Sequence, residues 1–324
     1  MIKNNEKERF NERPLVTYIL LCYQQAPYIR AAVKSALKQD YQNIEFILSD
    51  DKSSDTSFDL IKSEVEKYGT TNNIILNRNE HNLGLVTHFN KLLRMAKGEI
   101  IVVAAGDDIS LPHRVKRTVE LLADTEVSFV SFNDENIDAI GNTISKGTRV
   151  KYDGVKTFSI KEFISGQVIP FSGASRGFRR SLYDFFGDLN SDCPTEDTPY
   201  RIRGLLVGKT AISSEIAIKY RVHENNLSGP KHLPYMNVNH ISKQYHADSD
   251  LAFTENKINS TLYTKLNHWI DINNNKRVKS NLRQKLTNTN FKFSFLYHNI
   301  LTTNFFSLKE KLGLLKLCLY QRFS

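Results

Sequence analysis

The sequence predicts an α/β protein with a doubly wound, mostly parallel sheet and a helical C-terminal extension. Two observations support this fold class. Between residues 16 and 132, short apolar runs rich in strand-forming residues alternate with segments whose apolar residues recur at helical spacing. From residue 239 onward, the chain is rich in Lys, Asn and Leu, and its pattern is helical. Alternating strands and helices favour parallel strands joined by crossover helices.

Each element of the first region is predicted from its own pattern. The continuous apolar run Val16 to Cys22 is typical of a strand buried on both faces. Ile61, Val65 and Tyr68 fall on one face of a predicted helix. Ligands bind outside the carboxyl ends of the strands in such sheets, so the residues there should carry function. The predicted strands are 16–22, 44–48, 73–76, 99–104 and 127–132, and the predicted helices are 28–39, 57–68, 87–96 and 112–123.

The pattern loosens after about residue 140, where short strands alternate with loops up to Ser228. Pro230 and Pro234 mark a boundary. We therefore expect two regions, residues 1–230 and residues 231–324. Within the second region, the Asn-rich stretch Asp271 to Lys276 has the composition of a connection between two helices.

The bulk composition limits the function classes. The chain of 324 residues carries a net charge of +9, which suits nucleic acid, anionic lipid or a phosphorylated substrate and does not choose among them. Cys22, Cys193 and Cys318 lie far apart, which excludes a disulfide framework and a zinc spacing and favours a cytoplasmic setting. The polar segment Met1 to Pro14 lacks the apolar core of a signal peptide, and no apolar run is long enough to predict a membrane span.

The second predicted strand ends in a cluster of acids that includes Asp50, Asp51 and Asp55. An acidic residue at a strand end can accept hydrogen bonds from a ribose hydroxyl or a base N–H. Ser54 or Asp55 can also cap the helix that follows, which leaves Asp50 and Asp51 free. We therefore expect Asp51 to serve nucleotide binding.

The segment Gly106-Asp107-Asp108 ends the fourth predicted strand. No glycine-rich phosphate loop follows the first strand, since the first glycine of the chain is Gly69, so a bound diphosphate needs another partner. Adjacent carboxylates after a buried strand need solvent or a cation, and such hard oxygen ligands suit Mg²⁺ or Mn²⁺. A solvated turn is the alternative, because Gly-Asp-Asp is also good turn composition.

Several pieces of the sequence together resemble a known enzyme family. The pieces are Cys22-Tyr23-Gln24, Gln39 to Glu45, Asp50 to Asp55, Asn82-Leu83-Gly84, Gly98-Glu99 and Gly106-Asp107-Asp108. Their order over roughly residues 14 to 225 resembles family 2 glycosyltransferases of the GT-A fold, of the inverting type that builds bacterial surface polysaccharides. The resemblance implies a catalytic domain that binds a nucleotide sugar in residues 1–230. The Gln-x-x-Arg-Trp motif of processive members is absent, since the only tryptophan is Trp269.

The resemblance also implies a role for each matched side chain. Tyr23 would pack on the nucleotide base, and Asp51 would hydrogen-bond it. Arg78, at the end of the third strand, would lie near the nucleotide, with a surface arginine as the alternative. Asp107 would meet the ribose or the metal, and Asp108 would ligate the metal. Gln24 and Leu21 depart from the usual residues near the base pocket, which leaves the base open.

Two later motifs complete the match. Thr195-Glu196-Asp197 opens a predicted amphipathic helix, and by sequence alone it is a capping arrangement with Thr195 as N-cap. In the family, an acidic pair at this place supplies the base that takes a proton from the acceptor hydroxyl. This implies Asp197 as the catalytic base and Glu196 as the alternate. The ending Tyr220 to Ser228 implies His223 as a metal ligand or phosphate contact and Arg221 as a phosphate-binding residue.

The resemblance finally implies the partners: a nucleotide-sugar donor, with UDP favoured, and a saccharide or undecaprenyl-diphosphate-linked acceptor. Ser172 to Arg180 resembles the floor of the acceptor site. The apolar, lysine-containing stretch Phe305 to Tyr320 suits the inner face of the cytoplasmic membrane, and it equally suits packing on the catalytic domain or on a second subunit.

The competing hypothesis is a nucleic-acid-binding or nucleotide-polymerising protein that uses Gly106-Asp107-Asp108. Scattered basic residues and the lack of an aromatic–basic stripe argue against it, so we expect no nucleic-acid partner.

Overall fold

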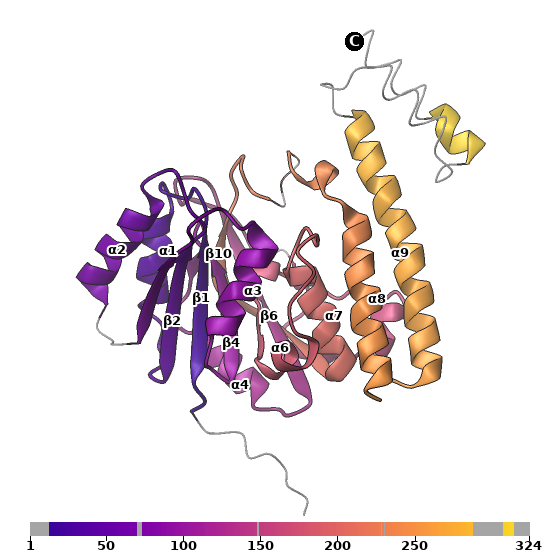
Figure 1. Cartoon of the computed structure of the whole chain (residues 1–324), viewed down its shortest axis with the longest axis horizontal. Coiled ribbons are helices and arrows are strands. Elements are labelled where there is room, and N and C mark those ends of the chain that lie inside the picture. Colours follow the sequence, from indigo (N-terminus) through magenta and orange to yellow (C-terminus); the bar gives the residue numbers. More distant parts are fainter. Residues whose placement is uncertain are drawn as a thin grey trace, which may run out of the picture.

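The computed structural model describes residues 13–69, 73–147, 149–227, 229, 231–287 and 307–313. Within these residues, ten strands form one sheet with helices on both faces, and two long helices stand beside it (Figure 1). The strand order is β3-β2-β1-β4-β9-β6-β10-β5, with β7 paired to β6 and β8 paired to β10. The predicted α/β fold class is confirmed.

The elements of the first region follow the predicted bounds closely and differ by a few residues at their ends. The strands are β1 (Val16–Cys22), β2 (Ile44–Asp50), β3 (Ile74–Arg78), β4 (Ile100–Ala105), β5 (Ile109–Ser110), β6 (Val127–Ile137), β7 (Thr143–Lys146), β8 (Val155–Phe158), β9 (Gly177–Arg179) and β10 (Lys209–Arg221). The α-helices are α1 (Ile29–Ala36), α2 (Ser57–Tyr68), α3 (Leu85–Met95), α4 (Arg114–Leu122), α5 (Ile160–Ile164), α6 (Ser181–Phe186), α7 (Asp197–Val207), α8 (Val238–Thr254) and α9 (Ser260–Thr287), with short 3₁₀ turns η1 (Gly173–Ser175) and η2 (Leu233–Tyr235).

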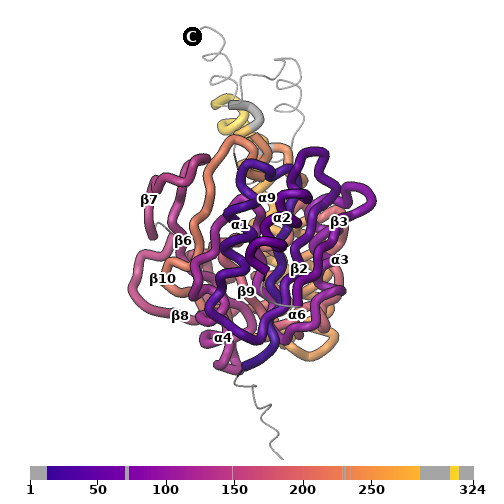
Figure 2. Tube along the Cα trace, turned by 90° about the vertical axis from the view of Figure 1, so that its left-hand side faces the viewer, coloured from indigo at the N-terminus to yellow at the C-terminus, as the bar shows by residue number. Residues whose placement is uncertain are grey.

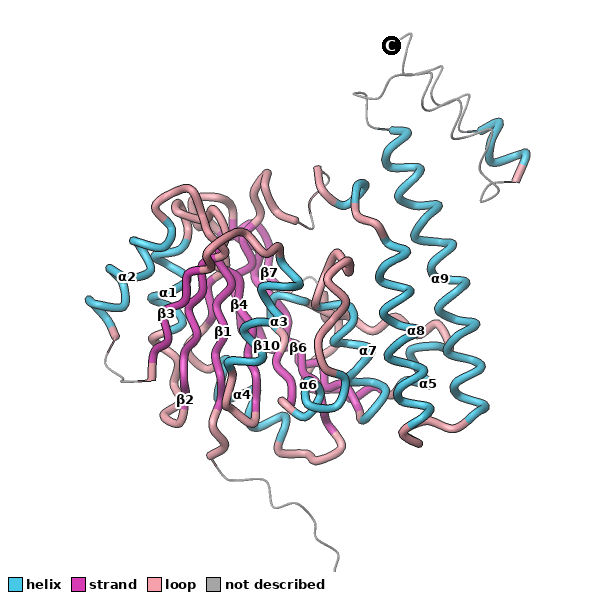
Figure 3. The backbone as a smooth tube through the Cα atoms, viewed as in Figure 1, coloured by secondary structure: helices cyan, strands magenta, loops and turns pink. Residues whose placement is uncertain are grey.

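Strands β3, β2, β1 and β4 run parallel and end at the upper edge of the sheet in Figures 1 and 3. All seven residues of β1 and of β2 are buried, because helices cover both faces of the sheet. The pairing of β1 with β2 places Cys22 beside Asp50, and its pairing with β4 places Leu21 beside Ala105. The acidic segments that follow β2 and β4 therefore meet at one edge.

Strand β9 departs from the predicted order of strands. It runs antiparallel between β4 and β6, so the sheet is not uniformly parallel. A Cβ atom at Gly177 would lie 2.5 Å from the Cγ2 atom of Thr118, so only glycine fits this approach to α4. Three residues are too few for a periodic pattern, which explains why the sequence does not predict this strand.

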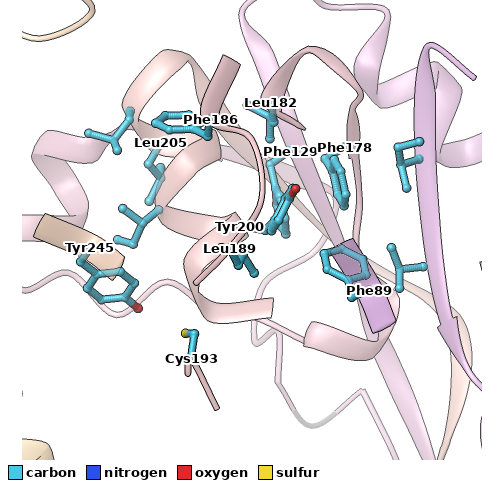
Figure 4. Packing of buried hydrophobic residues seen from close by; sticks show 14 of the residues in the cluster. Phe89, Phe129, Phe178, Leu182, Phe186, Leu189, Cys193, Tyr200, Leu205 and Tyr245 are labelled. Carbon is cyan, nitrogen blue, oxygen red and sulfur yellow. The ribbon is translucent and has the colours of Figure 1, made fainter. Parts of the chain in front are cut away.

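Two hydrophobic clusters lie on either side of the sheet, and β1 contributes to both. Tyr18 belongs to the cluster under α1 and α4, whereas Ile19 belongs to the cluster under α3, α6 and α7. In the second cluster, the ring of Tyr200 lies 5.3 Å from that of Phe89 and 4.6 Å from that of Phe178 (Figure 4). Figure 2 shows the sheet edges, with β7 and β8 at one side and β3 at the other.

Helices α8 and α9 extend the second cluster instead of forming a core of their own. Tyr245 and Leu266 are buried in it. Arg203 of α7 and Asp248 of α8 form a buried ion pair with an N–O distance of 2.9 Å. The region boundary near residue 230 stays a prediction.

The Asn-rich stretch 271–276 is not a connection between helices, which corrects the sequence-based prediction. It lies inside α9, and the connection from α8 to α9 is formed by residues 255–259. Asparagine weakens a helix by only a fraction of a kcal/mol, about 0.7 at most. Here Asn273 donates to the Trp269 carbonyl oxygen, and Asn274 donates to Asn239 of α8, so both amides support the packed helix pair.

Of the predicted C-terminal stretch Phe305 to Tyr320, only residues 307–313 are among those described. In that segment Leu308 and Leu312 are exposed, and Glu310 forms ion pairs with Lys279 and Arg283 of α9. Among the described residues, no helix combines the length and the apolarity needed to cross a bilayer.

Candidate active site

A cavity of about 1040 Å³ opens at the carboxyl ends of β1, β2 and β4. Four parts of the chain line it: the strand ends of the first region, the segment from Asn82 to His88, the start of α7 with η1, and the segment from β10 to α9. The cavity therefore lies where parallel sheets bind their ligands. Its lining includes seven of the predicted site residues, namely Tyr23, Asp51, Asp107, Asp108, Glu196, Asp197 and His223.

The turn Gly106-Asp107-Asp108 is held by the end of β10. The Oδ1 atom of Asp108 accepts a hydrogen bond from the backbone N–H of Arg221 at 2.9 Å. The Oδ2 atom of Asp107 lies 3.0 Å from the Nε2 atom of His223. A Cβ atom at Gly106 would lie 2.4 Å from the Oε1 atom of Gln25 and 2.8 Å from the Cδ1 atom of Ile29, so both side chains would have to shift to admit a larger residue.

The Asp108 carboxyl group is buried, and burial raises its pKa well above the ordinary value. The neighbouring charge of Asp107 raises this pKa further, whereas the Arg221 N–H and the charges of Arg114 and Arg221 lower it. A divalent cation beside the two carboxylates would favour their ionised forms.

The residues present fit such a cation. No cluster of three or more His, Cys, Asp or Glu side chains positioned to hold a metal occurs in the described part of the chain. Mg²⁺ is commonly bound through one or two carboxylates, with waters and substrate phosphates completing its shell. The pair Asp107 and Asp108 therefore suits a cation that arrives with a diphosphate.

His223 positions Asp107 in this structure. Its ring stacks on Tyr28 with centroids 4.8 Å apart. Its Nδ1 atom accepts the backbone N–H of Asn225 at 3.2 Å, so the neutral ring carries its proton on Nε2 and donates to Asp107. Metal ligation by Nε2 would require loss of that proton, and the metal role of His223 stays a prediction.

The structure gives Arg221 a different task from the predicted phosphate binding. Its guanidinium is buried and donates to the backbone carbonyl oxygens of Asp107, Asp138 and Ala139. It also lies over the ring of Tyr28, and it is not among the residues that line the cavity. Arg221 therefore fixes the Asp107–Asp108 turn through its Nε and Nη1 atoms, and its phosphate-binding role stays a prediction.

Asp51 organises the loop after β3. Its carboxylate accepts hydrogen bonds from the Asn79 side chain at 2.7 Å and from the backbone N–H groups of Leu83 and Gly84 at 2.9 Å. Gly84 has a φ angle of 77°, which favours glycine. The motif Asn82-Leu83-Gly84 therefore has a structural reason, which sequence reasoning missed. A nucleotide contact by Asp51 would use the acceptor capacity that remains on Oδ2.

Tyr23 and Arg78 differ in their relation to the cavity. Tyr23 lines it with 46% of its surface exposed, so its ring is accessible for stacking. Arg78 is not among the lining residues; its guanidinium lies 3.5 Å from the Asp50 carboxylate and donates to the Ser53 carbonyl oxygen. The predicted place of Arg78 near the nucleotide stays a prediction. The predicted cap is partly observed, since Asp55 accepts the N–H of Ser57 although Thr56 is the N-cap.

Glu196 and Asp197 lie at the start of α7 but have different surroundings. Glu196 is buried and forms an ion pair with Arg176 at 2.6 Å, and burial raises its pKa. The Oδ1 atom of Asp197 accepts from the hydroxyls of Thr195 and Thr198 and from the Thr198 N–H. Thr195 is therefore not the N-cap, because Glu196 holds that position and the Thr195 hydroxyl is turned to Asp197.

Gly173 is packed against the Asp197 carboxylate. A Cβ atom at residue 173 would lie 2.0 Å from the Asp197 Oδ2 atom. If Asp197 is the catalytic base that the resemblance implies, Gly173→Ala should displace this carboxylate and lower kcat by roughly 10- to 100-fold, the scale of a misplaced reacting group. Steady-state kinetics would measure this loss. If Asp197 is the target, adding Gly173→Ala to Asp197→Asn should cause little further loss; two fully additive effects would contradict this explanation.

His88 is a cavity residue that the sequence does not predict. Its Nε2 atom lies 2.6 Å from the Ser49 hydroxyl, and burial lowers its pKa to about 4. The unfolded chain takes up this proton below about pH 6.5. Folding stability should therefore fall as the pH drops from 6.5 towards 4.

We predict that His88→Gln removes this part of the pH dependence. The wild type should lose on the order of 2–3 kcal/mol more than the variant over that range. Urea unfolding at several pH values measures the difference. Identical pH profiles for the two proteins would show that His88 is not the titrating group.

Comparison with known proteins decides the family. The family model described as glycosyl transferase family 2 matches residues 17–186, just over half of the chain. The chain belongs to glycosyltransferase family 2. This membership favours the glycosyltransferase hypothesis over the nucleic-acid alternative.

Curated relatives of this chain include enzymes named for their substrates. It is 32% identical over 124 residues to the Escherichia coli UDP-Glc:alpha-D-GlcNAc-diphosphoundecaprenol beta-1,3-glucosyltransferase WfaP, covering 38% of this chain and 47% of the relative. It is 28% identical over 163 residues to a glycosyltransferase of Methanocaldococcus jannaschii, covering 48% of this chain and 54% of the relative. The chain thus spans about half the length of these relatives.

Solved structures match nearly the whole of this chain. TarS of S. aureus in complex with UDP-GlcNAc gives a TM-score of 0.58 at 16% identity, covering 92% of this chain and 77% of that one. The Pyrobaculum calidifontis mannosyltransferase in complex with GDP-Man and Mn²⁺ gives 0.56 at 16% identity, covering 95% and 85%. At these identities the likeness shows the fold alone, and the GT-A prediction is confirmed.

Proposed function

We propose that this glycosyltransferase moves a sugar from a nucleoside-diphosphate sugar, with UDP favoured, to a hydroxyl group of a saccharide or an undecaprenyl-diphosphate-linked saccharide. The reaction inverts the anomeric centre and depends on Mn²⁺ or Mg²⁺. One observation carries the proposal: the carboxylates of Asp107, Asp108 and Asp197 line the same cavity at the carboxyl edge of the sheet.

Asp197 is the general base in this proposal. Three donors fix its Oδ1 atom, whereas Oδ2 has no hydrogen-bond partner among the described residues and packs against Gly173. Oδ2 takes the proton from the acceptor hydroxyl. At the same time, the oxygen of that hydroxyl bonds to the anomeric carbon, and the bond between the anomeric carbon and the diphosphate breaks. Glu196 is a poorer candidate, because its carboxylate is buried in the ion pair with Arg176. Glu196 is then a positioning residue.

The donor half of the cavity is formed by the strand ends. Tyr23 offers a ring on which the nucleotide base can stack. Asp51 holds the loop with Leu83 and Gly84, which borders the cavity. A cation held by Asp108, with Asp107 beside it, would neutralise charge on the departing diphosphate. His223 and Arg221 keep that turn in place. UDP is favoured because the curated relative WfaP is named with a UDP sugar.

The cellular setting is the assembly of a bacterial surface polysaccharide at the inner face of the cytoplasmic membrane. The name of WfaP, which includes a diphosphoundecaprenol acceptor, supports this setting. The exposed side chains of Leu308 and Leu312 are compatible with peripheral membrane contact or with a subunit contact.

A thermal-shift panel of nucleoside diphosphates and nucleotide sugars, each with and without Mn²⁺, tests the proposal. A ligand present at 100 times its dissociation constant stabilises the folded state by about 2.7 kcal/mol. We expect UDP with Mn²⁺ to raise the melting temperature, and UDP alone to do so much less. No Mn²⁺-dependent shift with any nucleotide of the panel would contradict the proposed function.

A further inference from the structure

Helix α9 changes character where it passes the cavity. Near its start, Leu266 and Ile270 are buried in the hydrophobic cluster. Two turns later, the face that meets the cavity is polar. It consists of Arg277, Ser280, Asn281 and Gln284, whose spacing places them on one side of the helix. Beyond the hydrophobic cluster, α9 therefore presents polar side chains to the cavity.

The charge of the cavity singles out Arg277. Arg176 and Arg277 are the only arginine or lysine side chains among the described residues that line it. Arg176 is neutralised by the buried Glu196. Arg277 contacts the hydroxyl of Tyr245 at 3.4 Å and lies over its ring, and no described carboxylate lies within ion-pair distance of it. Its charge is therefore available to a ligand.

Apolar side chains adjoin Arg277 on the same wall. Met236 and Ile241 line the cavity together with Leu233 and Val238. The Asn281 side chain donates to the Met236 carbonyl oxygen at 3.0 Å, which fastens this segment to α9. The wall thus offers one unpaired cation beside an apolar strip, a combination suited to an amphipathic anion.

The place of α9 identifies which substrate it faces. The strand ends with Asp107 and Asp108 form one side of the cavity, α7 with Asp197 follows, and α8 and α9 stand beyond α7 (Figure 1). In an inverting displacement, the acceptor attacks from the side opposite to the departing diphosphate. The wall formed by α9 therefore lies on the side of Asp197, the general base, from which the acceptor approaches.

We propose that α9 forms an acceptor subsite in which Arg277 binds a phosphate group joined to an apolar portion of the acceptor. This subsite rests on the proposed function for its assignment to the acceptor. Arg277 selects for acceptors that carry a negatively charged phosphate group, because the guanidinium fork suits phosphate oxygens.

Calorimetric binding of decyl phosphate to the protein saturated with UDP and Mg²⁺ tests the subsite. We expect Arg277→Gln to weaken this binding by roughly 10- to 100-fold, as for loss of a charge-assisted hydrogen bond. Ser280→Asp, at an exposed position one turn away, should also weaken it by placing a negative charge beside the anion. Decyl glucoside should bind equally to all variants, and inorganic phosphate should bind more weakly than decyl phosphate.

Arg283→Gln is the matched control, because Arg283 lies on the same helix, pairs with Glu310 and is outside the cavity lining. It should leave decyl phosphate binding unchanged. The subsite is overturned if Arg277→Gln and Ser280→Asp bind decyl phosphate as the wild type does, or if inorganic phosphate binds as tightly. Displacement of decyl phosphate by UDP would assign Arg277 to the donor instead. Failure of UDP to bind would contradict the proposed function alone, since decyl phosphate binding to the free protein still reports on Arg277.

Discussion

Replacing Asp197 with Asn is expected to lower kcat by about 10²- to 10⁴-fold, the usual contribution of a general base. The amide has nearly the same shape as the carboxylate and can still accept from Thr195 and Thr198, so the start of α7 should keep its structure. It cannot take the acceptor proton. The affinity for the donor nucleotide should stay within about twofold of wild type, because Asp197 lies away from the donor half.

Steady-state kinetics for transfer and calorimetry for UDP binding measure the two effects separately. Glu196→Gln is the informative comparison, since this neighbouring carboxylate lines the same cavity but is paired with Arg176. We expect it to lower kcat much less than Asp197→Asn does. The reverse order would make Glu196 the base, and full activity of Asp197→Asn would refute the assignment.

Replacing Asp108 with Asn is expected to weaken Mn²⁺-dependent UDP binding by roughly 100-fold or more, the scale for removing one member of a buried charge pair. Asn keeps an oxygen that can accept the backbone N–H of Arg221, so the turn is preserved. The negative charge of the metal-binding side chain is lost. Without metal, the same variant should melt at a higher temperature than wild type, because burial disfavours the charged form of Asp108.

Calorimetry with UDP at fixed Mn²⁺ and a thermal melt without metal measure these opposite changes. Asp192→Asn provides the control, since its carboxylate is largely exposed and is not part of the cavity. Undiminished Mn²⁺-dependent binding by the Asp108 variant would remove Asp108 from the metal site.

The fold was predictable from the sequence wherever a repeating pattern determined it. The buried runs of β1 and β2 and the apolar face of α2 are local properties, and they set the parallel sheet. Strand β9 could not be predicted, because its place between β4 and β6 depends on contact with distant strands. The course of α9 through its Asn-rich stretch likewise depends on packing against α8.

The acidic residues that line the cavity were predictable, but their partners were not. Strand ends and motif order pointed to Asp51, Asp108 and Asp197. The tasks of Arg221 and His88 depend on side chains or backbone groups far away in the sequence, such as Asp107 for Arg221. The Arg277 side of the cavity also escaped notice, because its pattern is only that of a polar helix face.

Electron paramagnetic resonance of Mn²⁺ tests most directly whether the Asp107–Asp108 turn holds a cation together with a nucleoside diphosphate. Free Mn²⁺ gives a sharp signal that is lost when the ion binds to protein. We predict that the enzyme with UDP removes one Mn²⁺ per chain beyond what UDP alone removes, and that Asp108→Asn with UDP does not. Equal loss of the free signal with wild type and variant would contradict the metal site, and with it the proposed role of the turn.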